Sequence, residues 1–389
     1  MSARYIKSLD GVRALALLLI MTYHAGLFHF TWVSVQLFFV LSGYLITGIL
    51  WEEKMKPASV GFKYKKFLVR RSLRIFPLYL GYLFILGMTF LFFNFPTYYT
   101  TYFPYLITYT FNYTRLLEEW QGNPLFTHLW TLSIEEQFYL LFPIVIFFTP
   151  KKFIRYFLTA LIIIAPVCRL LLGEWYKGLG IEEGVIADAV YWNTLSHLDA
   201  FCMGGIIPVL SLDRKIRQPA KWLFWSIVIF LTAGAISYVY STSTYPYYND
   251  FGYHHWLIGN YQHVWHYTLI NLCCAALILV LVSPYSQQSI PLTRKFLEHP
   301  WIVRIGKVSY GMYVFHWLVL VYLFERYLMP DHLLGRFLLF IPYVAAVYLL
   351  AELSFSFYEA RFIRLKDKFF KDRSVPSKLS STTETLPGI

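Results

Sequence analysis

Ten long apolar stretches, separated by shorter polar segments, dominate the hydropathy pattern of this 389-residue chain. Each stretch is close to the roughly 20 residues that an α-helix needs to cross the hydrocarbon core of a bilayer. The pattern therefore predicts an all-α, polytopic integral membrane protein with about ten transmembrane helices. The predicted helices are approximately Gly11–Phe30, Val33–Trp51, Phe76–Phe93, Leu129–Thr149, Tyr156–Leu172, Tyr191–Leu210, Trp222–Tyr240, Val264–Ser283, Val308–Leu328 and Phe337–Tyr358.

Composition points the same way, because 57% of the residues are hydrophobic and only 14% are charged. A soluble domain carries about 25% charged residues, so lipid has to cover much of this surface. The net charge of +12 is also typical of nucleic-acid binding, but here the basic residues punctuate the apolar stretches. We predict a multi-pass protein of the cytoplasmic (inner) membrane and no nucleic-acid partner.

The distribution of Lys and Arg predicts the orientation of the helices. If the N-terminus is cytoplasmic and the helices alternate, the inner segments hold 29 of the 34 Lys and Arg residues. Both termini are therefore predicted to be cytoplasmic. Residues 1–373 are predicted to form one transmembrane domain, and the Ser-, Thr- and Pro-rich segment 374–389 a disordered cytoplasmic tail.

A few titratable residues lie inside the predicted helices, among them His24, Glu135, Asp199 and His316. Each would cost on the order of 3 kcal/mol if it faced lipid. We therefore expect these side chains to line one shared, hydrated central cavity. The alternative is that each makes a satisfied polar contact between two helices.

The first predicted helix carries Asp10 and Arg13 at its start and His24 further along. Arg13 and His24 are eleven residues apart, which is about three helical turns and about 16 Å. The two side chains then share a face, and His24 is predicted to lie near the bilayer midplane.

A basic cluster precedes the third predicted helix at Arg70, Arg71 and Arg74. Arg71 and Arg74 are three residues apart and share a helix face. Two guanidinium groups on one face match a phosphate-rich ligand. The alternatives are a stop-transfer signal and contact with lipid headgroups. No Gly-rich phosphate loop is present, which argues against a nucleoside triphosphatase.

The fourth predicted helix carries a polar stripe within the stretch HLWTLSIEEQFYLLFP. Glu135 and Tyr139 are four residues apart, as are Ser133 and Gln137. This spacing inside a span indicates side chains that face the protein interior.

Seven stretches in order make the chain resemble the membrane-bound acyltransferase family 3, the bacterial O-acyltransferases of surface glycans. They are LDGVRALA with YHA, VQLFFVLSGYLIT, RRSLRIFPLY, HLWTLSIEEQFYLLFP, LDAFCMGG, VSYGMYVFHW and FSFYEARFIRL. They span nearly the whole chain, so the resemblance is specific.

The resemblance implies an enzyme that moves an acyl group, usually acetyl, from cytoplasmic acyl-coenzyme A to a hydroxyl of an extracytoplasmic glycan or lipid-linked sugar. It implies that His24 and Glu135 are catalytic and that Arg13, Arg71 and Arg74 hold the coenzyme A phosphates. We expect Asp10, Ser133, Tyr139, Asp199 and His316 to support or line the cavity, and no metal to be needed.

Two positions depart from the common family form. Gln36 stands where Asp is common, and His197 stands where Arg is frequent. Both replacements bear on the identity of the acceptor more than on the type of reaction.

In the mechanism we expect, His24 takes the proton of the acceptor hydroxyl as general base, and Glu135 orients it or stabilises the imidazolium. Transient acylation of His24 is the alternative. A proton-coupled exporter of a glycan or small metabolite would use the same buried groups as a relay, and a non-catalytic scaffold for glycan assembly is a third possibility. Stabilisation by coenzyme A distinguishes the enzyme from both.

Overall fold

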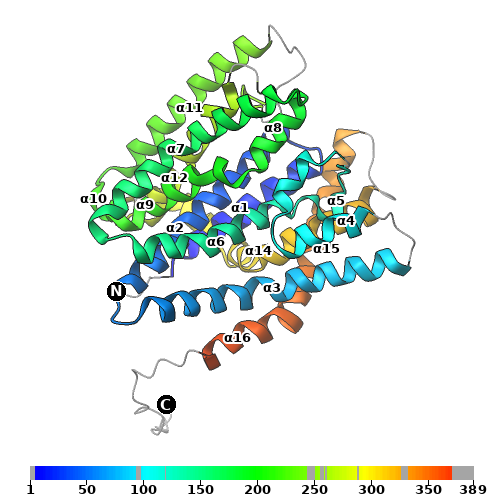
Figure 1. Cartoon of the computed structure of the whole chain (residues 1–389), viewed down its shortest axis with the longest axis horizontal. Helices are drawn as coiled ribbons and strands as arrows, with labels where there is room; N and C mark the ends of the chain where they lie inside the picture. Colours follow the sequence, from blue (N-terminus) through cyan, green and yellow to red (C-terminus); the bar gives the residue numbers. More distant parts are fainter. Residues whose placement is uncertain are drawn as a thin grey trace, which may run out of the picture.

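The structure is a computed structural model that describes residues 5–92, 98–118, 120–242, 250–254, 258, 261–286, 289–325 and 332–369. These residues form helices joined by turns, with no β-strand among them. The all-α prediction is therefore confirmed over this part of the chain (Figure 1). The predicted tail 374–389 lies outside the described residues.

The described elements include α-helices, short 3₁₀-helices and two π-helical segments. In chain order they are α1 (Lys7–His24), η1 (His29–Val33), α2 (Ser34–Met55), α3 (Val60–Phe92), α4 (Tyr98–Ile107), η2 (Phe111–Leu116), α5 (Pro124–Thr127), α6 (Trp130–Phe148), α7 (Lys151–Gly178), α8 (Glu183–Trp192), η3 (Thr194–His197), α9 (Leu198–Leu210), α10 (Leu212–Lys215), α11 (Pro219–Thr242), α12 (Gln262–Val282), η5 (Pro284–Ser286), α13 (Pro291–Leu297), α14 (Pro300–Val319), the π-helix η6 (Leu320–Glu325), α15 (Leu333–Ser354), the π-helix η7 (Phe355–Glu359) and α16 (Ala360–Phe369).

Eight helical segments among the described residues are long and apolar enough to cross a membrane, which supports an integral membrane protein. The two other predicted spans correspond to α1, which has 18 residues, and to the shorter apolar segment Thr194–Leu210. The eight segments are His29–Met55, Val60–Leu91, Pro124–Phe148, Lys151–Gly178, Pro219–Ser241, Gln262–Val282, Pro300–Phe324 and Leu333–Leu365.

Several predicted helix boundaries differ from the structure, and three of the differences change the position of candidate site residues. The first helix ends at His24 instead of Phe30. The third begins at Val60, so the arginine cluster lies within α3 and not before it. The sixth is divided among α8, η3 and α9, and Asp199 is therefore the second residue of α9 and not near the middle of a span.

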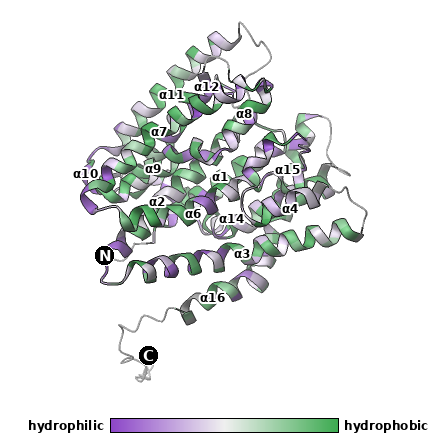
Figure 2. Ribbon diagram, in the orientation of Figure 1, coloured by the Kyte–Doolittle hydropathy of each residue, from purple (hydrophilic) through white to green (hydrophobic). Residues whose placement is uncertain are grey.

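The helices differ in how much of their apolar surface is covered by protein. Within the most apolar window, 61% of the residues of the second helix are buried, against 17% in α11. Figure 1 shows α1, α2 and α14 between α7 and α11 on one side and α3 on the other. Figure 2 shows hydrophobic residues along α7 and α11, as expected where a helix faces lipid.

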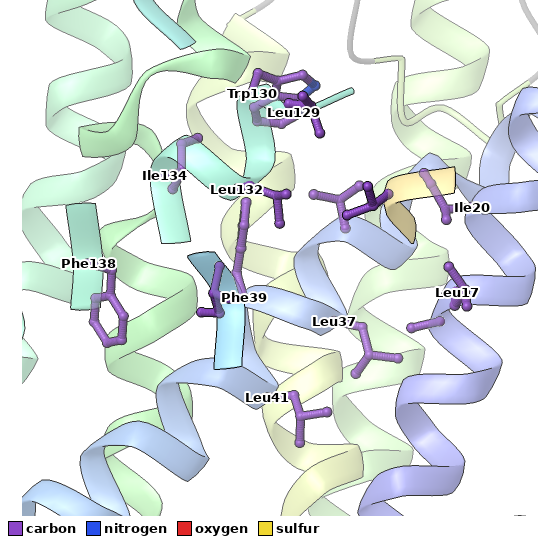
Figure 3. Packing of buried hydrophobic residues seen from close by; sticks show 14 of the residues in the cluster. Leu17, Ile20, Leu37, Phe39, Leu41, Leu129, Trp130, Leu132, Ile134 and Phe138 are labelled. Atoms are coloured by element: carbon purple, nitrogen blue, oxygen red, sulfur yellow. The ribbon is translucent and has the colours of Figure 1, made fainter. Parts of the chain in front are cut away.

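Figure 3 shows buried hydrophobic residues from α1, α2 and α6 within one core cluster. α2 also lies directly against α9 at glycines. A Cβ atom built on Gly204 would be 1.9 Å from the Val40 carbonyl oxygen, and one on Gly43 would be 2.1 Å from the Phe201 carbonyl oxygen. Only glycine allows this approach, which is a common way for membrane helices to pack.

Candidate active site

His24 is the last residue of α1, and a glycine fixes that position. Gly26 has φ of +67°, a conformation that glycine adopts without strain. The Gly26 N–H donates to the Tyr23 carbonyl and the Leu27 N–H donates to the Thr22 carbonyl, both at 3.0 Å. This is a Schellman motif, which satisfies the last carbonyls of a helix. Consequently His24 lies at a helix end and not at mid-helix.

Aromatic rings surround the half-buried imidazole of His24. Its ring centroid is 4.6 Å from that of Trp317, 5.1 Å from that of Tyr23 and 5.2 Å from that of His316. The first two rings restrict the orientation of the imidazole, and the third brings a second titratable group to it. The structure thus joins two residues that the sequence placed 292 positions apart.

The register between α1 and α14 produces this contact. A Cβ atom on Gly306 of α14 would be only 1.9 Å from the Asp10 carbonyl oxygen of α1. The two helices therefore touch through their backbones near Asp10, and they run in the same direction from there to His24 and His316. This close contact keeps the two helices together, and His24 and His316 both lie in the last turns of these helices.

A third histidine, His128, lies against His316. Its ring centroid is 5.0 Å from that of the fully buried His316. Tyr313 lies beside both, with its hydroxyl 2.8 Å from the His128 carbonyl and 2.7 Å from the Thr131 hydroxyl. Tyr313 also interacts electrostatically with Glu135.

Glu135 of α6 accepts two hydrogen bonds. The Tyr139 hydroxyl donates to its Oε2 at 2.9 Å, and the Ser42 hydroxyl of α2 donates to its Oε1 at 3.2 Å. The Arg71 guanidinium lies 5.5 Å from the centre of the Tyr139 ring. The predicted stripe of Glu135 and Tyr139 therefore faces the interior, next to the arginine cluster of α3.

The three predicted arginines share one electrostatic neighbourhood. Arg13 interacts with Glu135, Arg71 and Arg74. Arg13 also forms an ion pair of 2.9 Å with the buried Asp10. By contrast, Arg74 makes no hydrogen bond or ion pair with the residues that the structure describes, and it is exposed.

The start of α1 is held by a hydrogen bond from Tyr5. The Tyr5 hydroxyl donates to Oδ2 of Asp10 at 2.6 Å, while Arg13 donates to Oδ1. Partial burial and the neighbouring Asp10 carboxylate raise the pKa of Tyr5 to about 12. The hydroxyl therefore remains a donor near neutral pH and helps to fix the carboxylate that orients Arg13.

A cavity of about 280 Å³ opens at the basic half of α3. Its lining includes the acidic Glu53, which pairs with Lys66 at 3.3 Å. Arg71 and Arg74 remain outside any ion pair among the described residues, so the cavity offers cationic groups to an anion. It is lined by Ile49, Glu53, Lys63, Lys66, Phe67, Arg70, Arg71, Arg74 and Ile363. His24 and Glu135 are not among these lining residues.

Two predicted supporting residues have other contacts. The Ser133 hydroxyl is buried and donates to the Leu129 carbonyl of its own helix. Asp199 is fully buried and pairs with the equally buried Arg169 of α7 at 3.0 Å. Thr268 and Asn271 of α12 complete its hydrogen bonds. Asp199 therefore makes satisfied polar contacts between helices, which is the alternative that the sequence left open for these titratable residues.

His128 and Trp317 were not singled out from the sequence. His128 lies between α5 and α6, where helical spacing cannot be used to predict which way a side chain faces. Trp317 is one of many aromatic residues in the chain, and nothing in the sequence distinguishes it from the others. The end of α1 before Gly26 could have been predicted from the sequence, because a glycine after an apolar run is typical of a helix end. Among the residues that the structure describes, no group of three or more His, Cys, Asp or Glu side chains has the geometry to hold a metal ion.

Together, the apolar helices, the basic cavity and the buried histidines define an integral membrane protein with a polar interior site. The sequence model of a protein family described as an acyltransferase domain matches residues 6–353 of this chain. The chain therefore belongs to that acyltransferase family, and the resemblance seen in the sequence motifs is confirmed.

Relatives with O-acetyltransferase names come from Staphylococcus aureus. O-acetyltransferase OatA of strain MRSA252 is 29% identical over 416 residues, covering 99% of this chain and 61% of the relative. A protein of strain COL that carries a provisional O-acetyltransferase name, SACOL0978, is 28% identical over 373 residues, covering 92% of this chain and 57% of the relative. The chain thus spans about six tenths of the length of these relatives. No solved structure matches it.

Proposed function

We propose that this protein is a membrane O-acetyltransferase that moves an acetyl group from cytoplasmic acetyl-coenzyme A to a hydroxyl of an extracytoplasmic glycan. The observation that carries the proposal is the basic cavity of α3, whose arginines Arg71 and Arg74 face it without an ion pair among the described residues. Arg side chains bind phosphate oxygens through paired N–H groups. The names of the relatives support acetyl as the group transferred.

The donor is held at the end of the molecule predicted to be cytoplasmic. Arg71 and Arg74, together with Arg13, meet the phosphates of coenzyme A. Lys63 and Lys66 add positive charge to the same cavity. The narrow pantetheine arm then extends along α1 toward His24, about 16 Å beyond Arg13 at 1.5 Å per residue.

His24 performs the chemistry at the far end of this path. Its neutral imidazole takes the proton of the acceptor hydroxyl, the oxygen attacks the thioester carbonyl, and the carbon–sulfur bond breaks. The proton passes to the departing sulfur. In the alternative route, the acetyl group resides briefly on His24 before it reaches the hydroxyl. Glu135, tied to Ser42 and Tyr139, provides negative charge between the arginines and the histidines.

Binding of the donor can be tested on the purified protein in detergent. We expect acetyl-coenzyme A and free coenzyme A to raise the melting temperature of the wild-type protein, because a ligand that binds only the folded state stabilises it. The double variant Arg71→Ala with Arg74→Ala should lose most of this shift. The matched control is Lys152→Ala with Arg155→Ala, which removes the same charge from the same predicted face outside the cavity. An equal shift in both double variants contradicts the donor site.

Transfer can be tested in cells that express each variant at the wild-type level. Mass spectrometry of the host surface glycan should show acetylation with the wild-type protein and its loss with His24→Ala and Glu135→Ala. An acetylated glycan in cells with either variant removes that residue from the mechanism.

A further inference from the structure

The tautomer of His316 can be read from its hydrogen bond. Its Nδ1 lies 2.5 Å from the Tyr313 carbonyl oxygen. A carbonyl oxygen only accepts, so Nδ1 carries the hydrogen, and in the neutral ring Nε2 is then an acceptor. That Nε2 is buried and has no hydrogen-bond partner among the described residues.

His128 shows the same arrangement. Its Nδ1 lies 3.3 Å from the Pro124 carbonyl oxygen, and its Nε2 is likewise buried without a partner. Buried polar atoms nearly always have a partner, and each exception calls for an explanation. The Nε2 of His316 is such an exception, and it belongs to the ring that contacts His24.

The distance between His24 and His316 suits a hydrogen bond between their rings. An N–H···N bond of about 2.9 Å, with each nitrogen roughly 1.1 Å from its ring centre, places two imidazole centroids about 5 Å apart. The observed centroid distance is 5.2 Å, with 33° between the ring planes. Hydrogen bonds between catalytic groups are often long or poorly aligned without substrate and tighten when it binds.

The backbone around His316 is held in place independently. The Tyr343 hydroxyl of α15 donates to the His316 carbonyl at 3.2 Å. Directly afterwards α14 gives way to the π-helix Leu320–Glu325, a form that is rare and frequent at functional sites. His316 is therefore fixed in position beside the His24 ring.

We propose that His316 is a positioning residue for His24: its Nε2 accepts the ring N–H of His24 and so leaves the other ring nitrogen of His24 free to act as the base. This proposal rests on the proposed function of His24. The reacting proton moves from the acceptor hydroxyl to His24 and on to the sulfur, and His316 neither gains nor loses a proton. His316 thus fills the orienting role that a carboxylate fills in a Ser-His-Asp triad, a role that the sequence had offered to Glu135.

Two substitutions at the same position test this role. His316→Asn keeps a polar group near Nδ1 but has no atom at the place of Nε2. His316→Gln extends to that place and offers an acceptor oxygen. We expect His316→Asn to lower kcat about 100-fold or more, with KM for acetyl-coenzyme A within about twofold of wild type, and His316→Gln to recover at least about tenfold of the lost rate, as general-base effects of this size suggest.

The measurement is the initial rate of thiol release from acetyl-coenzyme A by purified protein with the host glycan fraction as acceptor. The control is His263→Gln, because His263 is also buried with unpartnered ring nitrogens but belongs to neither this site nor the cavity. It should leave kcat unchanged. Size-exclusion profiles and melting temperatures establish that each variant is folded.

The outcomes separate this proposal from the one on which it rests. Equal rates for His316→Asn and His316→Gln, a loss confined to KM, or wild-type activity in His316→Asn overturns the positioning role while an inactive His24→Ala leaves the proposed function intact. An active His24→Ala overturns both.

Discussion

Gln36 of α2 and His197 of η3 form a buried hydrogen bond of 3.3 Å between the Gln36 amide nitrogen and His197 Nδ1. The Tyr191 carbonyl lies 2.6 Å from His197 Nε2 and can only accept, so Nε2 carries the hydrogen and Nδ1 accepts from Gln36. These are the two positions at which the sequence departs from the common family form. The structure shows that the departures are paired: a neutral amide–imidazole contact stands where an Asp and an Arg would face each other.

This pairing predicts that the two positions change together. Gln36→Asp alone should destabilise the protein, because a carboxylate would be buried beside a neutral imidazole. His197→Arg alone should do so as well, because it would bury an unpaired cation. The double variant should be more stable than the sum of the single effects by about 1–3 kcal/mol. Thermal unfolding of all four proteins in detergent measures this coupling, and strictly additive effects would contradict a direct contact.

Loss of the Asp199–Arg169 ion pair is predicted to reduce stability without reducing kcat. Asp199→Ala leaves the fully buried Arg169 guanidinium uncompensated, at a cost of about 3–5 kcal/mol. We therefore expect a lower melting temperature and lower yield, but unchanged kcat for the molecules that remain folded. Arg169→Met combined with Asp199→Asn should recover stability, because no charge is then buried. A fall in kcat without loss of stability would instead assign Asp199 to the reaction.

The features that could be predicted from the sequence are those that depend on hydropathy and helical spacing. Long apolar runs gave the positions of most spans, and the four-residue spacing of Glu135 and Tyr139 correctly placed both side chains on one face. The end of α1 was predicted at Phe30 because residues 25–30 are largely apolar, whereas the backbone hydrogen bonds around Gly26 end the helix at His24.

Contacts between segments that are distant along the chain could not be predicted from the sequence. Arg169 is one of the five Lys and Arg residues outside the predicted inner segments, and the positive-inside rule uses such residues only as topology signals. The structure places it inside the fold against Asp199. Likewise, the approach of His316 to His24 follows from the backbone contact at Gly306, and a single sequence carries no information on which helices touch.

Gly306 therefore predicts a link between helix packing and activity. Gly306→Ala places a methyl group where the Asp10 carbonyl oxygen lies 1.9 Å away, so α1 and α14 must separate. Overpacking of this kind costs about 1–3 kcal/mol, and the separation also moves His24 away from His316. We expect a lower melting temperature together with a lower kcat. Gly61→Ala is the matched control, because nothing lies within 4 Å of its added Cβ; if both variants behave alike, the close contact is not what positions the histidines.

Binding of the donor should depend on ionic strength in a way that identifies the basic cavity. Exposed charges are screened over about 10 Å at 0.1 M salt and about 3 Å at 1 M, so the dissociation constant of coenzyme A should rise steadily with sodium chloride. Arg71→Ala should reduce both the affinity and this dependence, because one cation that faces the phosphates is lost. Lys152→Ala should change neither, since Lys152 lies against Phe153 outside the cavity. Titration of each protein at several salt concentrations measures both quantities, and the same slope in wild type and Arg71→Ala would show that the phosphates are bound elsewhere.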